Sequence, residues 1–97
     1  MHITLATGQS NTAVHTPAGG KTFYIEGWIL TINTSDVFVL SDGNQSDSTD
    51  FYKGQPTSGT IVCNYPKPEA AAAANDVLRY STGSTTAGDL TIWGYDA

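Results

Sequence analysis

The segment Lys21–Asn33, KTFYIEGWILTIN, constrains the fold more than any other part of this 97-residue chain. It is the longest apolar run, it is rich in β-branched and aromatic residues, and it holds a glycine at its centre, so a β-strand is favoured over a helix. A half-buried strand is polar at every second position, but neither alternate set here is polar. We therefore expect a central strand covered on both faces, by its own core and by a partner or second layer. The two sets are Phe23, Ile25, Gly27, Ile29 and Thr31, and Tyr24, Glu26, Trp28, Leu30 and Ile32.

Short extended segments recur on both sides of this run, separated by turn-rich clusters. Pro66 and Pro68 end one segment, and the alanine run Glu69–Ala74 after them is the only helical candidate, at most one short helical turn unless packing extends it. The spacing predicts an all-β, single-domain antiparallel β-sandwich over residues 1–97, jelly-roll-like, with residues 1–10 as an extended N-terminal arm. The predicted strands are Ile3–Ala6, Thr12–His15, Lys21–Asn33, Val37–Ser41, Phe51–Lys53, Thr60–Tyr65, Val77–Thr82 and Asp89–Asp96.

Composition excludes several classes of partner. The net charge is −5, and Lys and Arg together number four, which argues against binding to nucleic acid or to an anionic membrane surface. The N-terminus lacks a basic segment followed by an apolar core, so we expect no signal peptide and synthesis in the cytoplasm. Cys63 is the single cysteine, which excludes an intrachain disulfide, and its flanking residues predict a buried, inert thiol in a strand.

Few residues carry chemistry. Four polar residues in one loop are a candidate calcium site, but their spacing is that of no EF-hand and a solvated loop is the simpler interpretation. The two histidines and Cys63 match no zinc spacing, and no nucleophile has an evident base. We therefore expect no enzyme activity, no metal and no cofactor. If Glu26 is buried it needs a partner, which Lys21, Lys53 or Arg79 can supply, and an interchain salt bridge is favoured over a role as general acid. The loop residues are Asp42, Asn44, Asp47 and Asp50, and the histidines are His2 and His15.

The terminal strand, DLTIWGYD, divides into an aliphatic and an aromatic face. Leu90 and Ile92 share one face, whereas Trp93 and Tyr95 share the other with Thr91. Either face can be the core face, since the sequence of a short strand does not determine its register. If the aromatic face points outward, it is suited to a protein interface or to sugar stacking.

Three stretches together carry a family resemblance: AGGKTFYIEGWILTINTSDVFVLSDG, TSGTIVCNYPKPEAAAAANDVLRYSTG and AGDLTIWGY. The order of their turns and apolar positions resembles small jelly-roll decoration (cement) proteins of tailed bacteriophages. The matching positions are Gly20-Lys21, Asp36–Gly43, Tyr65–Asn75, Val77–Ser81, and Ala87-Gly88 before Leu90. Trp93-Gly94-Tyr95 and Asn75-Asp76 depart from the usual pattern.

The resemblance implies a virion structural protein that binds the shell on the outer surface of the phage head without catalysis. It implies the major capsid protein and further copies of the chain as partners, with a homotrimer favoured over a dimer. Two alternatives stay open: another virion component, such as a tail, fibre or head–tail junction module, and a carbohydrate-binding β-sandwich module. The candidate interface residues are Tyr24, Trp28, Trp93, Tyr95, Lys67, Pro68, Glu69 and Ala70.

Overall fold

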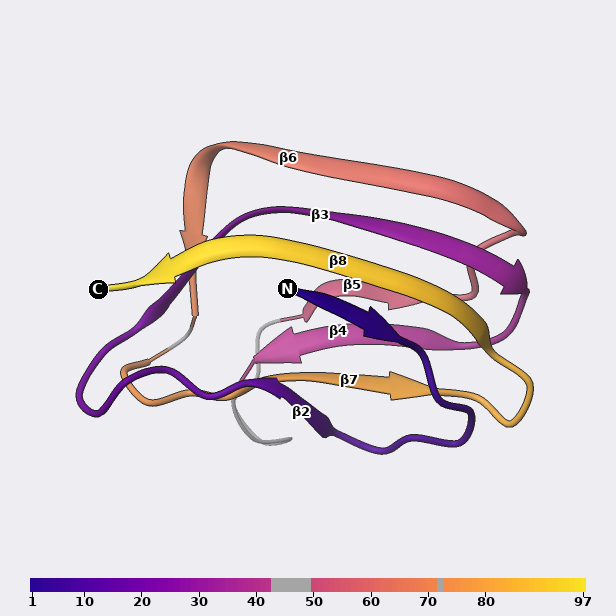
Figure 1. The fold of residues 1–97 in the computed structure, drawn as a ribbon, viewed down its shortest axis with the longest axis horizontal. Coiled ribbons are helices and arrows are strands. Elements are labelled where there is room, and N and C mark those ends of the chain that lie inside the picture. The colour runs from indigo at the N-terminus through magenta and orange to yellow at the C-terminus, as the bar shows by residue number, and fades with distance from the viewer. Residues whose placement is uncertain (43–49, 72) are drawn as a thin grey trace.

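Eight strands form two antiparallel four-stranded sheets in the computed structural model, which describes residues 1–42, 50–71 and 73–97 (Figure 1). The strand orders are β1-β8-β3-β6 and β2-β7-β4-β5. Consecutive strands lie in different sheets, except β4 and β5, and this is the connectivity of an eight-stranded jelly roll. The predicted all-β, jelly-roll-like sandwich is therefore confirmed. The strands are β1 (His2–Thr4), β2 (Thr12–His15), β3 (Phe23–Thr34), β4 (Phe38–Asp42), β5 (Asp50–Gly54), β6 (Gly59–Ala70), β7 (Leu78–Thr82) and β8 (Ala87–Asp96).

A β-bulge at Glu26 explains why the long strand looked apolar on both faces. Against β8, Ile25 pairs with Gly94 and Gly27 pairs with Trp93, so Glu26 is the extra residue of β3. A bulge of this kind switches the side of the sheet on which the following residues lie. The alternation is therefore broken once, and Trp28, Leu30 and Ile32 of the second set are covered by the core instead of by a partner. The residues that point into the core are Phe23 and Ile25 before the bulge and Trp28, Leu30 and Ile32 after it.

The core lies between the two sheets. From β8, Leu90 and Ile92 are fully buried, and they face the buried residues of β4 and β7. Trp28 packs edge-on against Tyr52 of β5, with ring centroids 5.8 Å apart. The other sheet supplies Phe38, Leu40, Leu78 and Tyr80 to the same cluster.

Strand β6 continues through both prolines, contrary to the expected end of the strand at Tyr65. Opposite the single residue Glu26, β6 has the four residues 65–68, and the strand bends sharply there (Figure 1). β6 is also an edge strand, and proline is tolerated at bulges and on edges because no ladder hydrogen bond is lost. The expected helical turn is absent from the described residues, since Glu69 and Ala70 pair with β3 instead.

The N-terminal residues do not form a free arm. β1 pairs with β8, the ammonium group of Met1 donates a hydrogen bond to the Ile92 carbonyl oxygen (2.6 Å), and Leu5 is buried in the core. The first five residues are thus part of the sandwich itself. The described residues include no helix long and apolar enough to cross a membrane.

Candidate functional site on the outer sheet face

The aromatic face of β8 points away from the core. Leu90 and Ile92 are fully buried, so the alternation of the strand turns Thr91, Trp93 and Tyr95 to the outer face of the β1-β8-β3-β6 sheet. Tyr95 remains 45% exposed. Of the two orientations that the sequence left open, the structure has the one with the aromatic residues outside.

The indole of Trp93 lies over a glycine of the neighbouring strand. Gly27 is its partner in the β3–β8 register, and a Cβ atom on Gly27 would collide with the indole ring and lie 2.7 Å from the Cys63 carbonyl oxygen. The missing side chain therefore makes the seat for the indole. This arrangement, in which an aromatic residue covers a glycine of the adjacent strand, holds Trp93 against the sheet.

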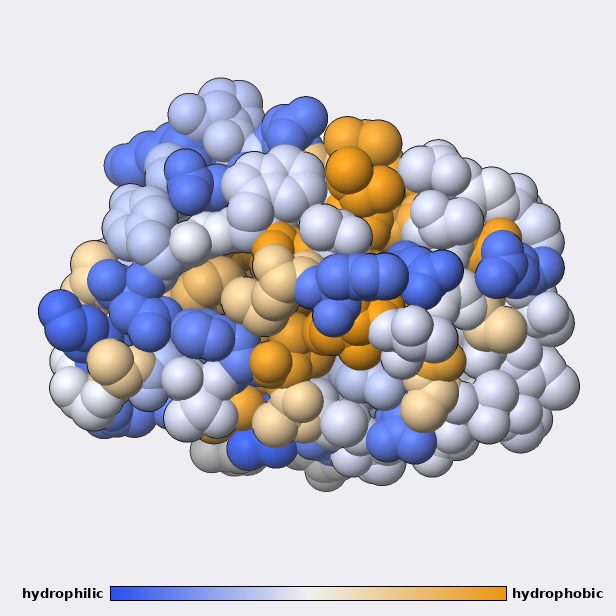
Figure 2. Space-filling view, viewed as in Figure 1, coloured by the Kyte–Doolittle hydropathy of each residue, from blue (hydrophilic) through white to orange (hydrophobic). Residues whose placement is uncertain are grey.

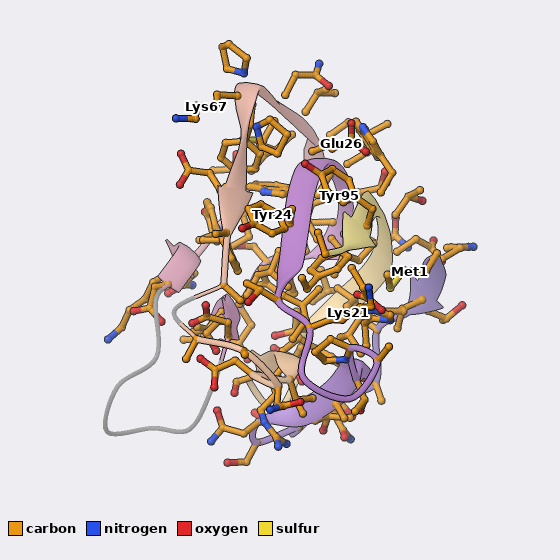
Figure 3. All side chains as sticks on the ribbon, turned by 90° about the vertical axis from the view of Figure 1, so that its left-hand side faces the viewer. Met1, Lys21, Tyr24, Glu26, Lys67 and Tyr95 are labelled. Atoms are coloured by element: carbon orange, nitrogen blue, oxygen red, sulfur yellow. The ribbon has the colours of Figure 1, made fainter. Side chains whose placement is uncertain are left out.

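Tyr24 and Tyr95 form a stacked pair beside this seat. The two residues are direct cross-strand partners, and their rings lie 5.4 Å apart with an interplanar angle of 10°. Figure 3 shows both tyrosines at the end of the sheet that faces the viewer, near Glu26. Cross-strand aromatic pairs stabilise a sheet and limit the rotamers of both rings.

Two aliphatic residues extend the aromatic group towards β6. Ile29 and Val62 are direct partners in the β3–β6 register, and Val62 is 57% exposed. Both occupy the outer face, because their neighbours Trp28, Leu30 and Ile61 point inward. We call the resulting surface the outer patch, consisting of Tyr24, Ile29, Val62, Trp93 and Tyr95.

The outer patch differs in charge from the corresponding face of the other sheet. There, Val39 of β4 lies between Ser81 and Lys53 in register, and the neighbouring row carries Arg79, so two of the chain's four cationic side chains lie on that face. The outer patch itself has no charged member. The outer patch is thus an uncharged, aromatic part of its sheet face, and the exposed pair of His2 and Asp89 lies elsewhere on the same face.

Trp28 does not belong to this surface, which corrects its assignment as a contact residue. Its side chain is only 2% exposed, and its indole N–H donates a hydrogen bond to the Tyr65 hydroxyl (3.1 Å) inside the sandwich. The cause is the bulge at Glu26, which turns Trp28 inward although Tyr24 points outward.

The predicted contact segment after Tyr65 lies next to the outer patch. Ala70 is the register partner of Tyr24, and Lys67 projects from the bend of β6 (Figure 3). Lys67, Glu69 and Ala70 are exposed and Pro68 is partly exposed. The structure therefore brings Tyr24, Trp93, Tyr95 and Ala70 together, with the proline bend at their border.

Two histidine–aspartate pairs join β8 to β1 and to β2. His15 Nε2 lies 2.7 Å from Asp96 Oδ1, and Asp96 also accepts a hydrogen bond from the Ala18 N–H (3.1 Å). These hydrogen bonds, that of His15 first, lower the pKa of Asp96 below its ordinary value. His2 Nε2 lies 3.1 Å from Asp89 Oδ1 on the exposed surface.

The residues considered for metal binding are not brought together. Each histidine is paired with an aspartate of β8, whereas Cys63 lies on β6. Of the loop candidates, Asn44 and Asp47 lie outside the described residues. In the described ranges there is neither a cluster of three potential metal ligands nor an enclosed pocket.

Burial raises the pKa of Tyr65 to about 12, the largest perturbation in the described part of the chain. The phenol accepts the hydrogen bond from Trp28 and is only partly exposed, so ionisation would place a charge at the rim of the core. Its geometry is that of a structural hydroxyl that satisfies the indole N–H.

Sequence reasoning missed Ile29, Val62 and the glycine seat. The available signal was Gly27 itself, because an isolated glycine inside a strand indicates a bulge or a close approach of another group.

Comparison of the chain with family models, with curated protein sequences and with solved structures found no match.

Proposed function

We propose that this protein is a non-catalytic structural component of a virion, a head decoration protein that binds the capsid shell through the outer patch. The observation that carries the proposal is the outer patch itself. It consists of three aromatic and two aliphatic side chains, none of them charged, which share one face of a rigid sheet. Exposed apolar surface of this kind marks an interaction site, and Trp and Tyr dominate the energetics of protein interfaces. The family resemblance supplies the kind of partner, the major capsid protein.

The fold suits this role physically. A jelly roll presents a preformed surface, and the two cross-strand contacts within the patch, Tyr24 with Tyr95 and Trp93 with Gly27, hold its aromatic rings in place. A preformed surface loses less conformational entropy on binding than a flexible one. On the outside of a head, such a protein would bridge adjacent shell subunits and add buried area at their joints, as a closed oligomer of the kind that the resemblance implies, a trimer or a dimer.

Quantitative mass spectrometry of purified particles from the source tests the proposal directly. A copy number close to that of the main shell protein supports a head decoration protein. A handful of copies per particle would move the chain to the tail, a fibre or the head–tail junction. Absence from the particles would overturn the virion assignment.

Binding of variants to undecorated shells tests the surface. Trp93→Ala and Tyr95→Ala are expected to weaken binding by about tenfold or more each, as removal of aromatic interface anchors does. Val39→Ala, an apolar truncation on the outer face of the other sheet, is the matched control and should bind like the natural chain. Equal binding by all three variants would place the contact elsewhere.

A carbohydrate-binding module is the second candidate, and the stacked, partly exposed Tyr24–Tyr95 pair favours it. Aromatic rings on a sheet face offer a platform on which sugar rings stack. Saturable binding to a glycan array that is lost in Trp93→Ala and Tyr95→Ala, combined with absence from particles, would establish this function in place of the first.

A further inference from the structure

Strand β6 carries the one long, unprotected edge among the described strands. Sheets end in four edge strands here, and proteins protect such edges by shortness, bulges, charge or proline. β1 has three residues, β2 has four with a bulge, and β5 has five with Lys53 among them. β6 has twelve residues, and its second half is protected by the bend with Pro66, Lys67 and Pro68. Its first half, residues 59–65, contains neither a charge nor a proline.

The side chains of this half-strand are apolar or neutral and incompletely covered. Val62 on the outer face is 57% exposed, and Thr60 and Asn64 beside it are exposed. On the inner side, Ile61 and Cys63 pack against the core but are only partly buried. Figure 2 shows hydrophobic residues at the upper rim of the molecule, over the middle of β6. The edge thus exposes both unpaired backbone groups and apolar side chains.

The sequence of this edge is self-complementary about Val62. If two antiparallel copies meet with Val62 opposite Val62, then Thr60 lies opposite Asn64 on both sides of the axis, and Ile61 lies opposite Cys63. The outer face then has a central aliphatic contact between two pairs that can hydrogen-bond through hydroxyl and amide groups. The inner face has two apolar pairs that cover the partly buried residues.

We propose that two copies of this chain associate through residues 59–65 of β6, antiparallel and about a two-fold axis at Val62. The two β1-β8-β3-β6 sheets then become one continuous eight-stranded sheet. Because Ile29 is the register partner of Val62 within each copy, four aliphatic side chains form one row across the junction. The outer patches of both copies lie on the same face of the joined sheet.

Charge and proline position favour a second copy as the occupant. Each copy carries a net charge of −5, so two copies repel one another at most surfaces, but the paired segment is uncharged. In the proposed register Tyr65 lies opposite Gly59, and Pro66, which has no N–H to donate, falls just beyond the paired segment. The proposal does not depend on what the outer patch binds, and its tests require no shell.

Sedimentation equilibrium of the full chain is the first test. The natural chain is expected to dimerise, and Val62→Lys to raise the dimer dissociation constant by about tenfold or more, because two like charges then face one another across the axis. Val37→Lys replaces another exposed valine, 45% exposed and outside β6, and should dimerise like the natural chain. A monomer at all concentrations, or a trimer unaffected by Val62→Lys, would overturn the proposal.

Cysteine pairs test the register, in a Cys63→Ser background that itself still dimerises. Val62→Cys should form a covalent dimer on mild oxidation, since opposite residues of antiparallel strands have Cα atoms about 4.5–5.5 Å apart, within disulfide range. Thr60→Cys and Asn64→Cys should cross-link only when mixed. Cross-linking of either variant with itself, or none in the mixture, would contradict a two-fold axis at Val62.

Discussion

The two tryptophans provide the sharpest test of the bulge in β3, because the structure places them on opposite sides of one sheet. Trp28 is buried between the sheets, and Trp93 lies on the outer face over Gly27. Trp28→Ala removes a core side chain and leaves a cavity, which costs about 3–5 kcal/mol of unfolding free energy. Trp93→Ala removes a side chain at the surface and leaves no cavity, so only the lost contact area counts, about 1–2 kcal/mol.

These costs are large relative to the stability of a domain of this size. Small domains have a free energy of unfolding of about 5–15 kcal/mol, and each kcal/mol lost lowers the melting temperature by about 4–8 °C. Trp28→Ala should therefore lower the melting temperature by about 12–40 °C, and Trp93→Ala by about 4–16 °C. Trp28→Phe, which keeps a ring but loses the hydrogen bond to Tyr65, should cost about 1 kcal/mol beyond its smaller volume.

Thermal melts by circular dichroism and urea denaturation measure these differences. Fluorescence adds an independent check, since Trp93→Phe leaves Trp28 as the single emitter, with the blue-shifted spectrum of a buried indole. Trp28→Phe leaves Trp93, whose emission should lie at longer wavelength. If Trp93→Ala costs as much stability as Trp28→Ala, or if the two emission spectra are reversed, the assignment of faces is wrong.

Three further predictions concern other contacts. Gly27→Ala should lower the free energy of unfolding by about 1–3 kcal/mol, because its Cβ collides with the indole of Trp93. The loss should be smaller in a Trp93→Ala background. Equal losses in the two backgrounds of a double-mutant cycle would contradict the contact between Gly27 and the indole. Since the folded-state pKa of Asp96 is lowered, its stabilising effect is present above its unfolded pKa of about 3.9 and is lost as pH falls. Asp96→Asn should therefore melt at a lower temperature than the natural chain at pH 6, and its melting temperature should change less as pH falls. Parallel plots of melting temperature against pH for the two proteins would argue against the pairing of Asp96 with His15. Because the pKa of Tyr65 is raised to about 12, stability should fall as pH rises from about 10 to 12. Tyr65→Phe should remove the last step of the tyrosine titration followed by absorbance at 295 nm. An unchanged titration would contradict the raised pKa of Tyr65.

The positions of the strands along the chain were accessible from the sequence because turn residues and β-branched runs alternate throughout. All eight predicted strands occur, and the segment Thr12–His15 has the predicted bounds. The rules used there are local: glycine and proline interrupt the chain, and apolar runs between them pair. Eight short segments within one small domain leave few architectures besides a sandwich or barrel.

The position of each side chain was less accessible, because one extra residue reverses every assignment that follows it. Before Glu26 the outward residue is Tyr24, and after the bulge it is Ile29. The prolines of β6 led to a wrong prediction, that the strand ends at Tyr65, for a related reason. Proline ends a central strand, but β6 is an edge strand with its own bulge, and edge position is a property of the whole sheet that no local pattern encodes.

The same bulge determines both the core and the candidate site. By inserting Glu26, β3 turns Trp28, Leu30 and Ile32 inward, so the strand contributes buried side chains along its whole length. It also sets Gly27 opposite Trp93, and the absence of a Cβ there leaves the space that the indole occupies. A strand with unbroken alternation would place either the first apolar residues or the last ones in solvent. The bulge therefore completes the core and creates the seat for Trp93 at once, which is why the most informative substitutions of this protein lie within two residues of Glu26 or on the strand facing it.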